Sequence, residues 1–269
     1  MTRVTPQALI EALGAARIFD LEQPRHSGMP IHPAHAPGFN YFLHRQHGSG
    51  VSEPPARTSA SGVLVMPEHT GTHIDALSHQ AEHLKLHGGV DVNSGVMSAA
   101  GFSVLGIETM PPLVGRGVLL DVAGRRRLEP EYEITVDELK KAAAAAGIEV
   151  GKGDVVLVRT GFGAQWDQPA DYLRAAGVSA AGSQWLADRG VAAVGADNMA
   201  FDTVNGFDAE LGVTLPAHVR LIVRAGIPII ENLNLEELAA ASVHEFGFIC
   251  LPLKMRGVTG SPVRPLALA

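Results

Sequence analysis

Cysteine is almost absent from this sequence of 269 residues, in which Cys250 is the single example. A disulfide therefore cannot form within one chain, and such usage is typical of proteins that work in a reducing compartment. Cys250 lies in the apolar run 247–252, which predicts a buried strand and an inert thiol. Residues 1–6 lack the basic and then apolar pattern of a secretory signal. We therefore expect a cytoplasmic protein.

Long apolar runs and basic clusters are also missing. No stretch reaches the roughly 18 apolar residues of a membrane span, so no membrane segment is expected. The formal net charge is -7, and Arg125–Arg127 is the only tight basic run. Nucleic-acid binding requires a clustered basic face, so we expect no such partner. With 46% hydrophobic and 18% charged residues, the composition is that of an ordinary globular protein.

Histidine, by contrast, is abundant and unevenly placed. Ten of the 12 histidines lie between His26 and His87. The densest stretch is His69-Thr-Gly-Thr-His73-Ile-Asp75-Ala-Leu-Ser-His79, with three histidines and an aspartate. No other segment concentrates so many groups that can bind a metal ion or transfer a proton.

The spacing within this stretch predicts a turn. In an extended strand His69 and His73 would lie roughly 13 Å apart, at about 3.3 Å per residue. That is too far for one metal, whose ligands lie about 2 Å from it. Thr70 to Thr72 are poor helix formers, whereas Gly71 tolerates unusual backbone angles. A turn at Gly71 would bring His69 back towards His73 and Asp75, which share one face of an extended chain.

Two imidazoles and one carboxylate, with no thiolate, suit a catalytic Zn or Mn ion better than a structural one. Such a cation can lower the pKa of a bound water towards neutrality. His79 would then remain free to act as general base and acid. The alternative is that these histidines are hydrogen-bonded structural residues. His26, His32 and His35 lie among prolines, where they could shape substrate specificity or simply lie at the surface.

The remainder of the chain alternates between strand-like and helix-like segments. Buried strands are predicted at 117–122, 155–159, 192–197, 227–231 and 247–252. Helices are predicted from a capping box at Thr135 to Ala146, from Ser179 to Arg189 before Gly190, and from Pro216 to Ala225 before Gly226. This alternation favours an α/β fold with a central sheet. No linker or repeat is visible, so residues 1–269 are expected to form a single domain.

A second pair of candidate ligands follows far downstream. His218 lies in the first turn of the predicted 216–225 helix, and Glu231 ends the strand after it. A helix that leads into a strand can bring both residues to the carboxyl edge of a sheet, where α/β sites gather. Taken alone, His218 could be a solvated helix start and Glu231 an exposed strand end.

The pattern His69-x-Gly-Thr-His73-x-Asp75-x-x-x-His79 resembles the signature of the cyclase family, which includes bacterial kynurenine formamidase and isatin hydrolase. Segments that fit the family elsewhere occur in the expected order along nearly the whole chain, at 27–30, 158–161, 195–197, 230–233 and 252–254. Formamidase members usually carry Asp-Ala-Pro in the signature, where this chain has Leu77 in place of the proline.

The resemblance implies a central mixed sheet with a swivelling β/β/α character, assembled as a homodimer or homotetramer. It implies that His69, His73 and Asp75 bind a first divalent metal, and that Asp75 bridges to a second held by His218 and Glu231. One or two Zn or Mn ions per chain are expected. His79 is the implied proton-transfer residue. The implied reaction is hydrolysis of a C–N bond in a small amide, cyclic amide or formamide.

Two other functions remain open at this point. The same metal and base could serve a lyase or cyclase acting on a small carbonyl compound. The chain could also be a non-catalytic metal-binding protein, although a storage site has no need for a spare base such as His79. Hydrolysis of a small panel of amides with Zn or Mn would separate these functions.

Overall fold

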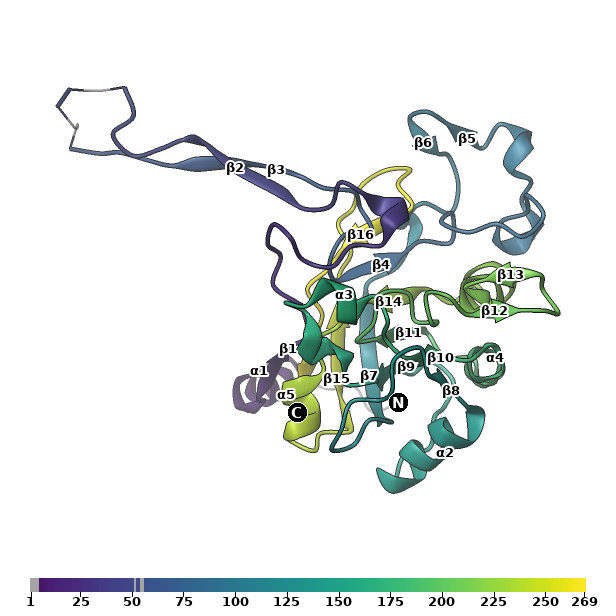
Figure 1. The fold of residues 1–269 in the computed structure, drawn as a ribbon. Helices are drawn as coiled ribbons and strands as arrows, with labels where there is room; N and C mark the ends of the chain where they lie inside the picture. The colour runs from purple at the N-terminus through teal and green to yellow at the C-terminus, as the bar shows by residue number, and fades with distance from the viewer. Residues whose placement is uncertain (1–4, 51, 54–55) are drawn as a thin grey trace.

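A nine-stranded mixed sheet forms the centre of the protein (Figure 1). The computed structural model describes residues 5–50, 52, 53 and 56–269. The sheet order is β1 (Ile18–Asp20), β17 (Leu266–Leu268), β15 (Glu245–Cys250), β7 (Leu113–Asp121), β9 (Val155–Arg159), β11 (Ala193–Ala196), β14 (Ile229–Glu231), β4 (His73–Asp75) and β16 (Gly260–Pro262). The predicted α/β class and the predicted strands are confirmed.

The four central strands β7, β9, β11 and β14 run parallel to one another. Their side chains alternate between two apolar cores, one on each face of the sheet. Leu119 and Leu157 belong to one core, whereas Val118 and Val156 belong to the other. Because both faces are covered, these strands are nearly continuous apolar runs. On the far side β4 runs antiparallel to β14, and it forms the link to the candidate site.

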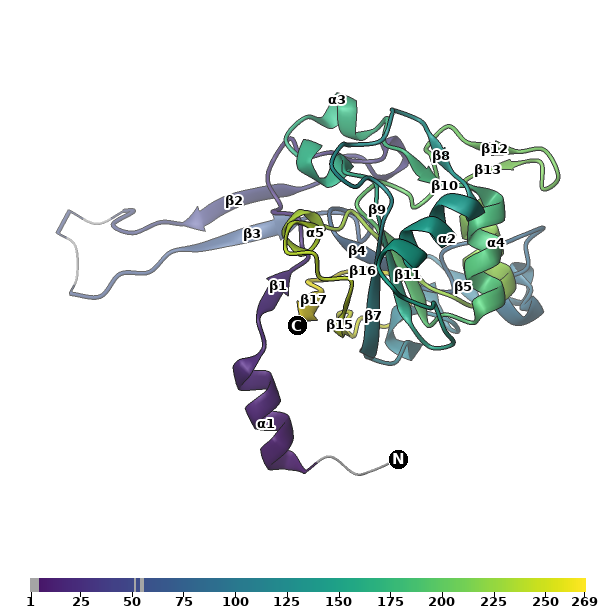
Figure 2. The same cartoon turned by 90° about the horizontal axis from the view of Figure 1, so that it is seen from below.

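Helices α2 (Val136–Ala145) and α4 (Ala180–Arg189) cover one face of the sheet (Figure 2). The capping box at Thr135 is confirmed: its hydroxyl accepts from the Glu138 amide, and the Glu138 carboxylate accepts from the Thr135 amide. The side chain of Ser179 caps the start of α4, and Gly190 ends that helix with a positive φ of 67°. Local capping signals therefore predicted both helices correctly.

The third predicted helix differs in kind. The chain is helical from Pro216 as predicted, but only residues 216 and 217 are α-helical, and His218–Ala225 form a π-helix, η6. It ends at Gly226, as predicted. The wider turn is unusual and is most often found at functional sites. Here it starts at His218, one of the predicted ligands.

The other regular segments are short. The remaining α-helices are α1 (Pro6–Ala15), α3 (Pro169–Tyr172) and α5 (Glu236–Ala240). Separate 3₁₀ turns lie at Pro33–His35 (η1), His87–Gly89, Val92–Ser94, Ile107–Thr109 and Phe162–Gln165. Four two-stranded sheets pair β2 (Asn40–Arg45) with β3 (Ser61–Val65), β5 (Met97–Ser98) with β6 (Gly101–Phe102), β8 (Glu133–Ile134) with β10 (Gly177–Val178), and β12 (Phe207–Asp208) with β13 (Val213–Thr214). Within the described ranges no helix combines the length and the hydropathy needed to cross a membrane.

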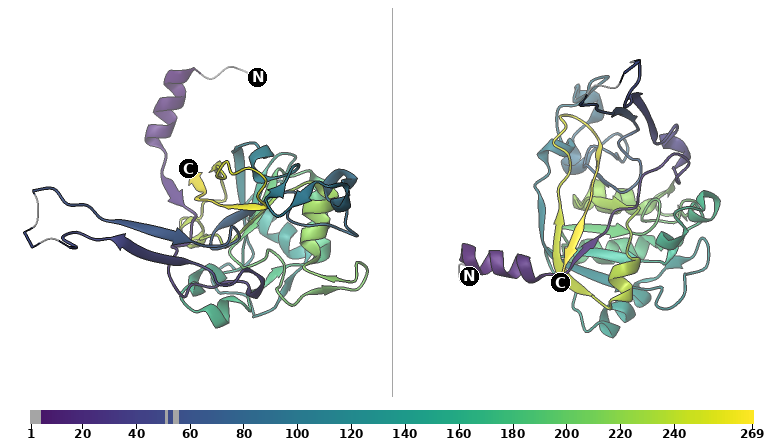
Figure 3. Two further views of the ribbon diagram at one scale, coloured as in Figure 1. Left: turned by 90° about the horizontal axis from the view of Figure 1, so that it is seen from above. Right: turned by 90° about the vertical axis from the view of Figure 1, so that its left-hand side faces the viewer.

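Two segments project from the body of the protein. Strands β2 and β3 form a long arm, and helix α1 extends away from the sheet (Figures 1 and 3). Every residue of β2 and β3 is exposed, and α1 buries none of its residues. The large apolar side chains exposed on these two segments are Leu9, Ile10, Leu13, Tyr41, Phe42, Leu43, Val63, Leu64 and Val65.

Candidate metal centre

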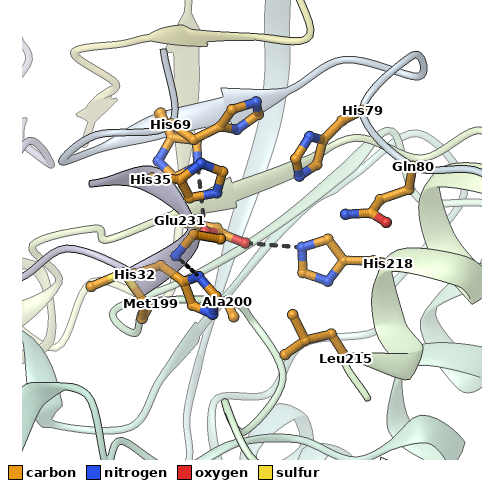
Figure 4. Close-up of a pocket in the computed structure, with 12 residues that line it drawn as sticks. His32, His35, His69, His79, Gln80, Met199, Ala200, Leu215, His218 and Glu231 are labelled. Carbon is orange, nitrogen blue, oxygen red and sulfur yellow. Dashed lines mark hydrogen bonds and ion pairs between the residues drawn. The ribbon is translucent and has the colours of Figure 1, made fainter. Parts of the chain in front are cut away.

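The six residues predicted from the sequence converge beside the sheet at β4 and β14, and Figure 4 shows four of them, His69, His79, His218 and Glu231. In the antiparallel pairing of these strands His73 lies directly opposite Glu231. Asp75 lies two residues further along β4, and His218 begins η6. His69 precedes the strand, and His79 follows it. Two distant parts of the chain therefore supply one cluster.

The predicted turn at Gly71 is present. Gly71 has a φ of 68°, a conformation that favours glycine. The chain folds back so that Nδ1 of His69 lies 2.8 Å from Oδ1 of Asp75. Nε2 of His69 lies 2.8 Å from the hydroxyl of Thr259. His69 is thereby fixed between its own motif and residues close to β16.

Two further histidines of the cluster, His73 and His218, are oriented by hydrogen bonds on their outer side. Nδ1 of His73 donates to the Gly71 carbonyl at 2.7 Å, and Nδ1 of His218 lies 3.2 Å from Oδ2 of Asp202. Their Nε2 atoms then face Glu231, each at 3.3 Å from one of its oxygens. Metal-binding histidines characteristically have such a carbonyl or carboxylate on the second nitrogen.

Asp75 supplies the clearest sign of a cation. Its Oδ2 is buried and accepts no hydrogen bond from any described group, and the nearest ion-pairing atom is Nε2 of His218 at 3.7 Å. Although burial opposes it, the hydrogen bond from His69 and the charge of that ring hold the pKa of Asp75 far below its ordinary value. An ionised oxygen without a donor is costly in a buried position. The residues present therefore fit a divalent cation.

The geometry offers two overlapping sets of ligand atoms around Asp75. One set comprises His69, His73 and Asp75, and the other comprises Asp75, His79 and His218; within each, the atoms lie no more than 4.8 Å apart. Burial, followed by the charge of Asp75, raises the pKa of Glu231. A cation between these two carboxylates would remove their repulsion. The donors are nitrogen and oxygen only, which suits Zn or Mn.

His79 differs from the other histidines because its ring is not held by the protein. It stacks on His69 with ring centroids 4.0 Å apart, and its centroid lies 6.1 Å from that of His218. No described residue forms a hydrogen bond with the ring. Burial lowers the pKa of His79 to about 3, so the ring is neutral at physiological pH. A neutral imidazole of this kind can accept a proton.

These side chains surround a cavity of about 230 Å³. Its walls are formed by His32, Ala34, His35, His69, His73, His79, Gln80, Met199, Ala200, Leu215, His218 and Glu231. The volume lies below the roughly 300–1,000 Å³ of typical drug-sized pockets, so it suits a small molecule. No lysine or arginine is among the lining residues. Besides the carboxylate of Glu231, the lining therefore offers a ligand only imidazole, amide and apolar groups.

Three features of the site were not apparent from the sequence. Asp202, which orients His218 and also accepts from the Ala217 amide at 2.9 Å, lies in no recognisable motif. For His35 the sequence left open a role in substrate specificity or a position at the surface, and the structure places it in the cavity wall. Leu77 faces elsewhere: it packs against the helix-covered core and lines a separate apolar cavity of about 200 Å³.

Comparison with known proteins relates this arrangement to other chains. The family described as "Putative cyclase" matches residues 19–203. Cyclase-like protein 3 of Oryza sativa subsp. japonica is 29% identical over 264 residues, covering 94% of this chain and 80% of that protein. A kynurenine formamidase of Bordetella petrii is 25% identical over 250 residues, covering 93% and 97% of the two chains.

An isatin hydrolase of Roseibium aggregatum is 26% identical over 212 residues, covering 76% of this chain and 73% of that protein. Among solved structures, a novel cyclase superimposes with a TM-score of 0.84 at 28% identity, over 99% of this chain and 92% of the other. The family match includes the first half of the cluster, His69 to His79, and the matches to the Oryza sativa protein, the formamidase and the solved cyclase extend over more than nine-tenths of this chain.

Proposed function

Because the chain belongs to the cyclase family, whose profile matches residues 19–203, we propose that it catalyses metal-dependent hydrolysis of a non-peptide C–N bond. The bond belongs to an amide, cyclic amide or formamide in a small molecule. Relatives named kynurenine formamidase and isatin hydrolase support this reaction class. The observation that carries the proposal is the unpaired, buried oxygen of Asp75 among histidines, beside the unengaged ring of His79.

His69, His73 and Asp75 are proposed as ligands of a first cation, and His218 and Glu231, with Asp75 as a bridge, as ligands of a second. Zn and Mn both suit this donor set, so one or two of these ions per chain are proposed. When bound, the cation polarises the substrate carbonyl and lowers the pKa of a water molecule. Asp202 and the Gly71 carbonyl keep His218 and His73 in the orientation that this role requires.

His79 is proposed as the group that moves the proton. As water attacks the carbonyl carbon, a C–O bond forms and the ring nitrogen of His79 accepts the proton that the water loses. The tetrahedral intermediate then collapses with cleavage of the C–N bond, and His79 returns the proton to the leaving nitrogen. The products are an amine and a carboxylic acid, which releases its remaining proton to solvent to become a carboxylate, so one water is consumed for each bond cleaved.

Turnover of a panel of small amides tests this proposal. We expect the protein loaded with Zn or Mn to hydrolyse at least one of N-formylkynurenine, isatin and simple lactams, as followed by product formation in chromatography. Chelator-treated protein serves as the matched control and should be inactive until metal is restored. If metal-loaded protein hydrolyses no member of the panel, the reaction class is wrong. Loss of a substrate without C–N cleavage would instead assign a lyase or cyclase.

We further propose that residues 1–269 form one cytoplasmic domain that assembles as a homodimer or homotetramer. An isolated two-stranded hairpin is at best marginally stable in water. The β2–β3 arm nevertheless exposes apolar side chains on both faces, including Tyr41 and Phe42. Contact with another copy of the chain would cover the apolar side chains of this arm. It would also cover the apolar face of α1.

Replacing arm residues should weaken this assembly. We expect the double variant Phe42→Ser and Leu64→Ser to shift the protein towards monomer in sedimentation analysis, because both side chains are about half exposed in the single chain. Leu84→Ser, at an equally exposed position outside the arm, is the control and should leave the mass unchanged. A wild-type protein that sediments as a monomer would contradict the proposed assembly.

A further inference from the structure

His35 belongs to a wall of the cavity that the signature motif does not supply. It ends the short helix η1 (Pro33–His35), in the loop between β1 and β2. Its ring stacks on that of His69 with centroids 4.9 Å apart, and it lies 6.2 Å from the His79 ring. Figure 4 places His35 and His32 on one side of the cavity, with His79 and His218 on the other. A molecule in the cavity therefore lies between these two sides.

The distances between the rings define a position for one oxygen atom. A nitrogen of His35, one of His69 and one of His79 all lie within 4.8 Å of one another. For any such triangle there is a point within about 2.8 Å of all three corners, which is a normal hydrogen-bond distance. An oxygen at that point lies within hydrogen-bond distance of the three nitrogens.

Two of these three rings have free hydrogen-bonding capacity. His69 is already engaged at both nitrogens, by Asp75 and Thr259. The rings of His35 and His79 form no hydrogen bond with any residue that the structure describes. His32, by contrast, accepts from the Ala34 amide at 3.2 Å and so stabilises η1. Among the histidines of its own wall, His35 is the one whose ring forms no hydrogen bond with a described residue.

The loop that carries His35 is held in place from several directions. Met29 is buried in a cluster with Trp166, Tyr172 and Met199. The Trp166 indole donates to the Pro24 carbonyl at 2.8 Å, and the Gln23 amide donates to Thr72 within the signature motif at 2.9 Å. This support fixes the wall relative to the metal-binding strand β4. Preorganised donors of this kind are the ones that stabilise developing charge.

We propose that His35 is a further catalytic residue, which donates a hydrogen bond from its ring to the acyl oxygen of the substrate. The inference rests on the proposed hydrolysis. As water adds to the carbonyl carbon, negative charge grows on this oxygen, and the His35 donor stabilises it. His79 faces the same position and handles the proton, so the two rings have separate tasks. The substrate thus presents its acyl oxygen to the wall formed by His32, Ala34 and His35.

Variants of His35 in the full-length, metal-loaded protein test this role. His35→Phe keeps an aromatic ring against His69 but removes the donor, so we expect kcat to fall about 100-fold, the scale for loss of one such donor, with little change in KM. His35→Gln, which restores an N–H donor, should recover at least part of that loss. Elemental analysis should show an unchanged metal content in both. His26→Phe, on the same loop outside the cavity wall, is the control and should match wild type.

Binding of formate, followed by calorimetry on the metal-loaded protein, gives a second readout that does not depend on turnover. We expect His35→Phe to bind formate about tenfold more weakly, as for loss of one hydrogen bond to a charged group. Unchanged kcat and unchanged formate binding in His35→Phe would overturn the role of His35 while leaving the hydrolase proposal intact. Loss of metal in that variant would also overturn it, by making His35 a ligand. Weaker formate binding together with no hydrolysis of the panel by wild type would support His35 and refute the proposed reaction.

Discussion

Asp75→Ala should release the metal and abolish turnover together, with a loss of activity of at least about 1,000-fold. Asp75 belongs to two of the three sets of potential ligand atoms, and its two oxygens face different histidines. Removing it deletes the buried negative charge that a divalent cation would neutralise. Elemental analysis of purified protein, combined with an amide-hydrolysis assay, measures both effects.

A matched control separates this effect from a general loss of stability. Asp154 is also a buried aspartate, 5% exposed, and it pairs with Arg116 far from the cavity. Asp154→Ala should lower the melting temperature because it breaks this ion pair, yet it should keep the metal and most of the turnover. Full metal occupancy in Asp75→Ala would refute the assignment of Asp75 as a ligand.

His79→Ala should keep the metal and lose most of the turnover, by about 100- to 10,000-fold, the range typical of a general acid–base group. The ring of His79 is not fixed by a hydrogen bond to any described residue, and burial keeps it neutral, so it has the form of a proton acceptor rather than of a tightly held ligand. Steady-state kinetics and elemental analysis on the same preparation would show whether the two properties separate.

His83→Ala is the natural comparison for this variant. His83 lies four residues further along, but it is exposed and does not line the cavity. Its removal should change neither metal content nor kcat. If the metal content of His79→Ala fell to zero, His79 would be a metal ligand. Its ring nitrogen lies close enough to Asp75 and His218 to share a cation with them. The proton-transfer role would then have to pass to another group.

Features that depend on neighbouring residues were predicted well from the sequence. The capping box at Thr135, the left-handed glycine at Gly190 and the turn at Gly71 each follow from the chemistry of a few consecutive positions. The apolar runs of the central strands were equally clear, because strands buried on both faces must be apolar throughout. The histidine motif identified the main candidate ligands for the same local reason.

Features that depend on distant pairing were not predictable in this way. The sequence indicated His73 and Glu231 separately, but their position opposite one another comes from the pairing of β4 with β14. Asp202 contacts His218 only because residues 198–203 pack against the start of η6. The sequence predicted a helix here but could not show that its geometry is π-helical, because the pattern of apolar residues does not distinguish the two helix types. His35 could be placed in the cavity only once the packing around Met29 was known.

The order of strands in the sheet also bears on how the protein is made. Strand β4, which carries His73 and Asp75, lies between β14 and β16, and both of these partners come from residues beyond 228. On the ribosome, a chain that has emerged only as far as α4 therefore holds three of the proposed ligands with no strand on either side of β4. The cluster can close only when residues 218–262 have been synthesised. Completion of the proposed metal-binding cluster is consequently a late event, and it requires long-range strand pairings, which form slowly.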